Sequence, residues 1–494
     1  MSHQSKYISI IDLGTGSIRI SVYKLTGELV ESSKAENPII YPNTNWAEQD
    51  PVLWWNILKK GFLNFPDPIR NNIMAVSVTS QREGIVPVNR NFEPLDNIII
   101  WLDGRAEEEA KYISDVLGKN LVYDICGLVP HPVWSLSKIL WLKKNRPGIF
   151  RNTYKFLQAE DYIVSRLSGK AVTEFSIASR TCILDVKNKK WSEKILTAFE
   201  IDPSKLPELL EPGTMVGTIV PSVAKEFGLN PATNIFTGAG DQQAAAIGSG
   251  AVFDGSVSIG IGTSSALSFT LSKPIPDPGK RIILNCAALP GMWEYEPPIW
   301  NTGGLIKWFF DELIKETYNF EKILSQTEEI PAGSDGIIVL PYFSGSGSPR
   351  WNPSQKGVFF GLTLAHHRSH LLKAVMESIA FEIKYNIESA ERSGIKVSNI
   401  ILSGGASQNK PLCQIISDVL QMKVDISSET EASSKGCFIL TKAALEKRKD
   451  FLNIFHSVST NNVTIHPRSD NAFIYENIYK KYVKLGDIFD QNKL

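Results

Sequence analysis

The sequence predicts two α/β domains, on three observations. The chain has 494 residues, and a single hydrophobic core usually stops growing at about 250–300 residues. Strand-like runs alternate with helical patterns along most of the chain, which is typical of sheets covered by helices. The short motif GT-x-S occurs at Thr15 and again at Thr263, about half a chain length later. We therefore expect a duplicated domain, divided into residues 1–248 and 249–494.

Composition and charge exclude several classes of protein. Apolar residues make up 43% of the chain and charged residues 21%, which are ordinary values for a globular protein. Lys plus Arg and Asp plus Glu both number 52, so the overall charge does not attract nucleic acid. The five cysteines are widely spaced and include no C-x-x-C pair, which argues against a disulfide framework and against a zinc site.

The chain also lacks the sequence features of membrane and secreted proteins. No run approaches the ~18 apolar residues of a membrane span. The first residues lead directly into an apolar strand, without the features of a signal peptide. We expect a cytoplasmic protein that binds neither membrane nor nucleic acid. Its oligomeric state, a homodimer included, stays open.

The first half begins with two runs rich in Ile, Val and Tyr, at residues 7–25, around the turn Gly14-Thr15-Gly16. This pattern indicates a β-hairpin, and a third strand is expected near residues 27–30. Alternating segments follow. Strands are expected at 73–79, 85–88, 98–101 and 234–236, and helices at 50–63, 106–117, 135–145 and 159–167.

The second half begins in the same way, because residues 257–262 lead through a glycine turn into the apolar residues 266–269. Ligands of layered α/β folds bind at strand ends, so we expect a site between the two halves. Helices are expected at 304–316, 368–393, 408–420 and 431–446, and strands at 336–340, 399–403 and 423–426.

Three glycine turns each follow a predicted strand. Residues 12–17 (DLGTGS) offer the carboxylate of Asp12 and then small residues whose backbone N–H groups can approach an anion. Asp12 would hold Mg²⁺ through water. Residues 260–264 form a second turn, and residues 403–407 a third that opens a helix. Each turn alone is better explained by an ordinary hairpin or strand-to-helix turn, but the three together indicate a nucleotide site.

Asp241 lies in a fourth glycine-rich turn, GAGDQQ, between a strand and an Ala-rich helix. In phosphoryl transfer an Asp accepts the proton of the attacking hydroxyl, while metal and backbone donors stabilise the phosphate charge. An Asp at this place can equally cap the helix. From the residues alone both interpretations remain open.

Two longer stretches resemble the signatures of one family. Residues 134–145 (WSLSKILWLKKN) are similar to the first signature of the FGGY family of carbohydrate kinases, with a departure at Val133. Residues 357–362 (GVFFGL), His370-Leu371 and 374–377 (AVME) are similar to the second. The resemblance covers essentially the whole chain. It implies two ribonuclease H-like domains of the actin and Hsp70 type, with a cleft between them that binds ATP, Mg²⁺ and a sugar.

The resemblance also implies roles for individual residues. Asp241 is expected to be the catalytic base, and Gln242 a substrate contact. Nucleotide contacts are expected at the phosphate turns and on the nucleoside side: Gly14, Thr15, Gly262 and Thr263, then Gly303, Gly404, Gly405 and Asn409.

Substrate contacts are expected after the strand at residues 73–79. An Arg beside a Glu can donate to and accept from adjacent hydroxyls, although a solvated surface pair is the alternative. Arg82, Glu83 and Trp101 match the clamp of glycerol kinases. Val133, followed by Trp134, replaces the tyrosine that completes this clamp. The lost phenol disfavours glycerol as substrate.

The remaining substrate signals conflict. Residues 82–86 (REGIV) resemble autoinducer-2 kinases, whereas 46–51 (WAEQDP) and 101–106 (WLDGRA), which include Asp103, resemble xylulose kinases. The leading expectation is phosphorylation of a primary hydroxyl of a ketopentose such as xylulose. Autoinducer-2, glycerol or another polyol are the alternatives. An actin-like ATPase or a sugar-binding regulator represents a different class, which Asp241 and the Arg82–Glu83 pair disfavour.

Overall fold

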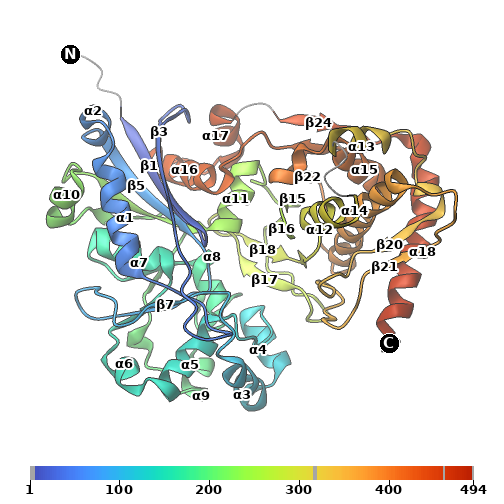
Figure 1. Cartoon of the computed structure of the whole chain (residues 1–494). Helices are drawn as coiled ribbons and strands as arrows, with labels where there is room; N and C mark the ends of the chain where they lie inside the picture. The colour runs from blue at the N-terminus through green and yellow to red at the C-terminus, as the bar shows by residue number, and fades with distance from the viewer. Residues whose placement is uncertain (1–5, 315–319, 460–461, 492–494) are drawn as a thin grey trace.

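The computed structural model describes residues 6–314, 320–459 and 462–491. Two lobes lie side by side, each built on a mixed β-sheet, and a group of helices extends below the first lobe (Figure 1). That group consists of α3 (Glu107–Leu117), α4 (Lys119–Cys126), α5 (Ser135–Asn145), α6 (Pro147–Asn152) and α9 (Glu193–Ala198).

The first sheet has the strand order β13-β14-β5-β1-β2-β3. Strands β1, β2 and β3 form an antiparallel meander, and β5 and β14 run parallel to β1. The bounds are β1 (Tyr7–Leu13), β2 (Ser17–Lys24), β3 (Leu29–Glu36), β5 (Ile73–Ser80), β13 (Met215–Thr218) and β14 (Asn234–Gly240).

The second sheet has the order β17-β18-β16-β15-β22-β23-β24, with β19 paired to β16. Its strands β15, β16, β18, β22 and β23 take the same places and directions as β1, β2, β3, β5 and β14. This agrees with the repeat expected from the sequence. The bounds are β15 (Ser256–Ile261), β16 (Ser265–Leu271), β17 (Ile283–Cys286), β18 (Trp293–Glu296), β19 (Pro298–Ile299), β22 (Asn399–Ser403), β23 (Val424–Ile426) and β24 (Val463–Ile465).

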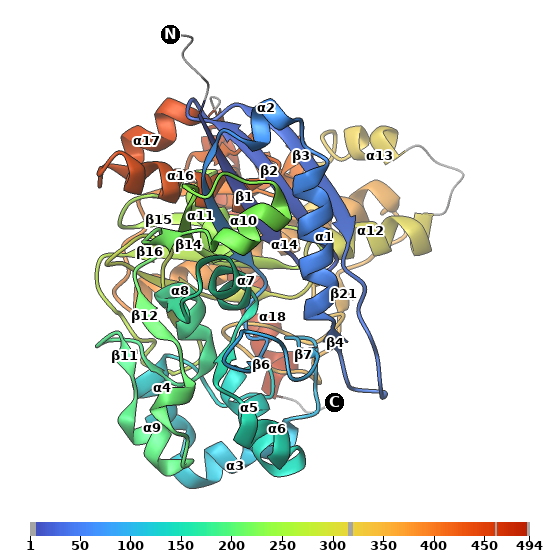
Figure 2. The ribbon, with the colours of Figure 1, turned by 90° about the vertical axis from the view of Figure 1, so that its left-hand side faces the viewer.

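Helices cover both faces of the first sheet. On one face α1 (Pro51–Leu63), α7 (Ala159–Ser168) and α10 (Pro221–Phe227) pack through residues such as Trp54 and Phe62 (Figure 2). On the other face, α16 (Ala432–Leu445) brings residues from the C-terminal half of the chain against β1 and β5.

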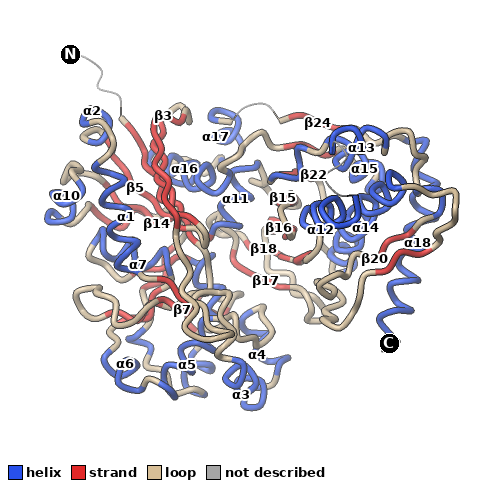
Figure 3. Tube along the Cα trace, viewed as in Figure 1, coloured by secondary structure: helices blue, strands red, loops and turns tan. Residues whose placement is uncertain are grey.

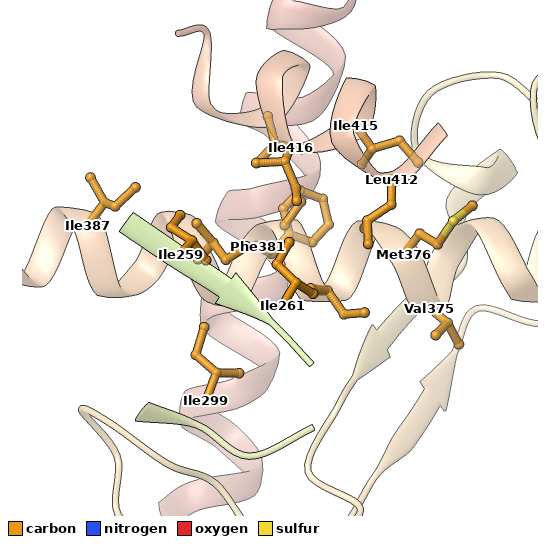
Figure 4. Close-up of a cluster of buried hydrophobic side chains, with 14 of the residues drawn as sticks. Ile259, Ile261, Ile299, Val375, Met376, Phe381, Ile387, Leu412, Ile415 and Ile416 are labelled. Atoms are coloured by element: carbon orange, nitrogen blue, oxygen red, sulfur yellow. The ribbon is translucent and has the colours of Figure 1, made fainter. Parts of the chain in front are cut away.

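The second sheet is covered by α12 (Gly303–Trp308), α14 (Arg368–Arg392), α15 (Lys410–Leu420) and α18 (Ala472–Gln491). Figure 4 shows Ile259 and Ile261 of β15 facing Met376 and Phe381 of α14, with Ile416 of α15 beside them. All five side chains are almost fully buried. The period of the apolar residues in α14 is therefore explained by core packing.

The remaining elements connect these layers, as the tube trace shows (Figure 3). Within the described residues, no helix combines the length and the apolar character that crossing a membrane requires. The connecting elements are α2 (Asp67–Arg70), α8 (Phe175–Ala178), α13 (Phe320–Gln326), α17 (Phe451–Val458), β4 (Glu48–Gln49), β6 (Val86–Val88), β7 (Ile98–Ile99), β8 (Lys155–Leu157), β9 (Val172–Glu174), β10 (Leu184–Asp185), β11 (Lys190–Trp191), β12 (Glu208–Leu210), β20 (Ile338–Leu340) and β21 (Val358–Phe360).

Several expected elements differ from the structure in their bounds. The strand expected near residues 27–30 is β3, Leu29–Glu36, and the strand expected at 234–236 continues to Gly240, so the glycines before Asp241 belong to β14 and not to a turn. The helix expected at 304–316 ends its α-helical part at Trp308 and continues as a π-helical turn, Phe309–Ile314, whose wider i→i+5 bonding the apolar period does not reveal. Residues 315–316 lie outside the described part of the chain. The helix expected at 408–420 begins only at Lys410, because Asn409 caps it and a 3₁₀ turn, Gly405–Gln408, precedes it.

Candidate active site

The carboxyl ends of three parallel strands form the floor of the candidate site. Leu13 of β1 pairs with Ser80 of β5, and Ser80 pairs with Gly240 of β14. The chain segments that leave these strands therefore start at the same edge of the sheet. They carry Thr15, Arg82 and Asp241, which the sequence analysis had singled out from three separate motifs.

Asp241 is the first residue of α11 (Asp241–Ser249), and Gly240 occupies the N-cap. Asp241 is therefore not the N-cap residue, although its Oδ1 accepts from the N–H of Gln242 in the first turn at 2.7 Å. It keeps 27% of its accessible surface, and the Arg82 Nε lies 3.7 Å from Oδ1. A Cβ on Gly240 would lie 2.7 Å from the Arg82 Cδ, so glycine is what lets Arg82 approach.

Burial raises the pKa values of two carboxyl groups at this edge of the sheet. It raises the pKa of Asp241 to about 6; the Arg82 charge opposes this shift and the Glu83 charge adds to it. The pKa of Asp12 rises to about 7, mainly by burial and further by the neighbouring Asp241 charge. A carboxylate with a pKa close to neutrality is suited to act as a general base.

A buried network of four charged side chains lies beside Asp241. Arg82 donates through both Nη atoms to the two Glu296 oxygens, at 3.1 Å each. Arg180 donates from Nη1 to Glu296 at 2.9 Å and from Nε to Glu83 at 2.5 Å. The four residues are only 5–8% exposed. The surface-pair alternative for Arg82 and Glu83 is therefore wrong, because buried charges require partners of this kind.

Arg180 and Glu296 were missed by the sequence analysis. Arg180 follows α8 in a short 3₁₀ turn, and Glu296 ends β18 of the second sheet. The one signal for Glu296 was the alternation WEYE at residues 293–296, which places two acids on the same side of a strand. The pattern does not show that this side of the strand is buried against the other domain.

The Glu83 backbone is held in an unusual conformation. Its φ is 68°, in the left-handed region that residues other than glycine rarely occupy. Ser135 Oγ and Lys138 Nζ donate to its carbonyl at 3.1 and 3.0 Å, and its N–H donates to Gln158 Oε1 at 2.7 Å. Such strain persists only where the surroundings hold it in place. Helix α5, which carries the first family signature, thus positions Glu83.

The two expected tryptophans flank this network differently. Trp101 is 41% exposed, and its indole N–H donates to the Thr15 hydroxyl at 2.9 Å. Trp134 is buried, donates to the Val129 carbonyl at 2.6 Å, and has the Arg180 guanidinium 4.8 Å from its ring centre. Trp101 is therefore accessible to solvent beside the first glycine turn, and Trp134 packs against Arg180 of the network.

The other two expected substrate contacts have different environments. Asp103 is 3% exposed, and its carboxylate is bound to Arg105 and to the N–H of Ala47. It orders the loop after β7 and has no free oxygen directed at solvent. The Gln242 side chain is exposed next to Asp241, where it remains accessible to a ligand.

The expected nucleotide residues of the second half lie at the edge of the second sheet. Gly262 and Thr263 form the hairpin turn between β15 and β16, and Gly303 donates to the Gly262 carbonyl at 2.9 Å. Gly404 follows β22 with φ 87°. A cavity of about 490 Å³ lies here and is lined by residues that include Gly303, Gly405 and Asn409. Asn409 also caps α15 by accepting from the Leu412 N–H.

The first hairpin turn is fixed by its neighbours. Gly14 donates its N–H to the Ser17 carbonyl at 3.0 Å, and its carbonyl accepts from the Asn37 amide at 2.8 Å. The Thr15 hydroxyl donates to Gln81 Oε1 at 3.2 Å. Burial and then the neighbouring Asp241 charge raise the pKa of Asp12, so the two carboxylates interact. Hard oxygen donors with excess negative charge fit a hydrated Mg²⁺ ion.

Comparisons with known proteins agree with this architecture. Models of the FGGY family of carbohydrate kinases match residues 7–248 with their N-terminal domain and 257–445 with their C-terminal domain. The chain is 30% identical over 428 residues to a xylulose kinase of Lactococcus lactis (85% of this chain, 83% of the relative). It is 27% identical over 500 residues to a gluconokinase of Bacillus subtilis (98% and 96%).

The structural comparison gives the same result. The crystal structure of gluconate kinase from Lactobacillus acidophilus matches with a TM-score of 0.91 and 25% identity, and 99% of each chain is covered. These likenesses confirm the expected fold of two ribonuclease H-like domains. The names of these relatives give a sugar, xylulose, for one and a sugar acid, gluconate, for others.

Proposed function

Since the chain belongs to the FGGY family of carbohydrate kinases, we propose that it transfers the terminal phosphoryl group of ATP to a primary hydroxyl of a ketopentose such as xylulose. Autoinducer-2, glycerol and other polyols are the alternative acceptors. The observation that carries the proposal is the position of Asp241, at the strand edge beside the Arg82–Glu83 pair. An ATPase switch or a sugar-binding regulator would not need a base and a hydroxyl clamp at one place.

Asp241 acts as the general base in this proposal. Its carboxylate takes the proton of the substrate hydroxyl while the hydroxyl oxygen forms a bond to the γ-phosphorus, and the bond from that phosphorus to the bridging oxygen breaks to release ADP. Arg82 and Glu83 hold neighbouring hydroxyls as donor and acceptor. Trp101 is exposed beside Thr15, and its ring packs on the carbon chain in this proposal.

The nucleotide is bound by the two hairpin turns and the cavity beside Gly405. Backbone N–H groups at Gly14, Thr15, Gly262 and Thr263 face the phosphates in this arrangement, and the nucleoside occupies the cavity lined by Gly303 and Asn409. Asp12 would hold Mg²⁺ through water, and the ion would neutralise phosphate charge. Gly404, with a φ of 87°, directly precedes Gly405 at this cavity.

The proposal is tested by an ADP-release assay over xylulose, ribulose, erythritol, glycerol, gluconate and the autoinducer-2 precursor. We expect the highest kcat/KM with a ketopentose. Glycerol as best substrate would contradict the interpretation of Val133, which removes the phenol of the glycerol clamp.

The catalytic role is tested separately with Asp241→Asn. We expect kcat to fall by about 10²–10⁴-fold, the usual contribution of a positioned base, while ATP binding measured by calorimetry stays unchanged. Asp450→Asn is the matched control, because Asp450 is an acid at the start of another helix and caps α17. Near-normal turnover of Asp241→Asn would show that another group takes the proton.

A further inference from the structure

Glu296 reaches from the second domain into the substrate clamp of the first. It stands at the end of β18, opposite Ile283 of β17. Its two oxygens accept three bonds from Arg82 and Arg180 and one from the Asn285 amide, at 2.8–3.1 Å. Both arginines belong to the first domain, so this carboxylate is the second domain's contribution to the clamp.

The charges around Arg82 and Arg180 are fully matched without a ligand. Arg82 contacts Glu296 at 3.1 Å, Asp241 at 3.7 Å and Glu83 at 3.8 Å, and Arg180 contacts both Glu83 and Glu296. Two guanidinium groups thus face three carboxylates. A ligand carboxylate placed here would meet like charges in a buried site, where an unpaired charge is costly.

The neighbouring groups offer hydrogen bonds but no further positive charge. Gln243 Nε2, Asn285 Oδ1 and Glu294 Oε2 are buried and have no hydrogen-bond partner within the described structure. The Oε1 atom of Gln243 accepts a hydrogen bond from Arg82, and the Nδ2 atom of Asn285 donates one to Glu296. The amides of Gln243 and Asn285 are uncharged, and the Glu294 carboxyl can add only negative charge. Such donors and acceptors suit hydroxyl groups or water.

We propose that Glu296 is a specificity-determining residue, which neutralises Arg82 and Arg180 so that the clamp accepts uncharged polyhydroxy substrates and rejects sugar acids. This inference rests on the proposed kinase function and names its substrate class. Glu296 acts through the two arginines and is therefore a positioning residue. It also links substrate choice to the second domain, which a clamp confined to the first domain would not do.

The test compares xylulose with gluconate, which differ in charge. We expect Glu296→Gln to raise the ratio of kcat/KM for gluconate over xylulose by about tenfold or more, the size of one close charge interaction. Glu296→Asp keeps the charge and should leave the ratio within about threefold of the wild type. The inhibition constant of gluconate against xylulose should fall in Glu296→Gln, which gives a readout that needs no gluconate turnover.

A matched control and an opposite variant keep the test decisive. Glu382→Gln removes a buried acid of α14 in the same domain, which bonds to the Tyr342 and Tyr482 hydroxyls and to neither arginine of the clamp; the ratio should not change. Arg180→Gln removes a cation, so the inhibition constant of gluconate should rise. Equal loss of activity toward both sugars in Glu296→Gln would overturn the inference.

The two proposals fail in different ways. Absence of phosphorylation of any neutral sugar by the wild-type enzyme would contradict the proposed function. An unchanged ratio in Glu296→Gln, with a wild type that phosphorylates ketopentoses, would contradict only the role of Glu296. A wild type that prefers gluconate while Glu296 is intact would contradict both.

Discussion

The environment of Asp241 determines the pH range in which it can serve as a base. Burial raises its pKa to about 6, the Arg82 charge lowers it, and the charges of Glu83 and Glu296 raise it; its own charge raises the pKa of Asp12. A base must be deprotonated before it accepts a proton. We therefore expect kcat/KM for the sugar to rise with pH through about 6 and to level off above it, measured at saturating ATP.

The direction of this shift can be checked with Glu83→Gln. Because the Glu83 charge raises the pKa of Asp241, its removal should move the midpoint of the profile to lower pH, whatever the loss in activity. A wild-type profile that is flat between about pH 5 and 8 would exclude a base of this pKa.

At the residue scale, the sequence predicted those site residues that lie at or just beyond the end of a strand. Asp12 is the last residue but one of β1, Arg82 follows β5 by two residues and Asp241 directly follows β14, and parallel strands bring such positions together. Arg180 and Glu296 could not be predicted in this way, because the partners that explain their burial are distant in the chain. Asp103 shows the converse, since its motif is present while its carboxylate is bound to Arg105.

At the element scale, the close packing of α11 on α16 supports the position of Asp241. A Cβ on Gly248 of α11 would lie 1.9 Å from the Ala432 carbonyl oxygen, and one on Gly436 of α16 would lie 1.9 Å from that of Ala244. The two backbones therefore touch at two reciprocal points. Each helix also packs on the sheet of the other half of the chain, so the pair joins the domains behind the site.

We expect Gly248→Ala to destabilise the protein. Alanine favours a helix by about 1 kcal/mol over glycine, but the new methyl group would overlap a backbone carbonyl, and overpacking of this kind costs about 1–3 kcal/mol. The free energy of unfolding in urea should therefore fall. In Gly148→Ala of α6, where a Cβ meets nothing within 4 Å, it should stay the same or rise. Equal effects of both changes would show that α11 and α16 can separate.

The bounds of helices and strands were predicted best where a local signal, such as a cap or a proline, marks them. The bounds of α1 agree within a residue with the expected helix, because Asp50 caps it and Pro51 occupies its first turn. The bounds of α5 and β22 agree fully. The π-helical turn Phe309–Ile314 was not predicted, since its apolar residues also fit an α-helical period.

At the scale of the whole molecule, the duplicated strand order was predictable and the contact between the domains was not. The motif at Thr15 and Thr263 marks equivalent hairpins in two sheets of the same topology. The lower helices, however, dock on the second domain through α4. The Tyr123 hydroxyl donates to the Ile282 carbonyl at 2.6 Å and accepts from the Asp277 N–H at 3.0 Å. No pattern within one segment predicts hydrogen bonds between residues this far apart in the chain.

This contact gives a prediction for the assembled protein. Tyr123 is 2% exposed, so Tyr123→Phe leaves a buried carbonyl at Ile282 and a buried N–H at Asp277 without partners, which costs about 1–3 kcal/mol. The free energy of unfolding in urea should fall by that amount, and the KM for the sugar should rise, because the Arg82–Glu296 contact spans the same interface. Tyr112→Phe, at a half-exposed tyrosine of α3, is the control and should change neither quantity. If Tyr123→Phe lowers stability but leaves the sugar KM untouched, the lower helices dock on the second domain without helping to hold the substrate clamp.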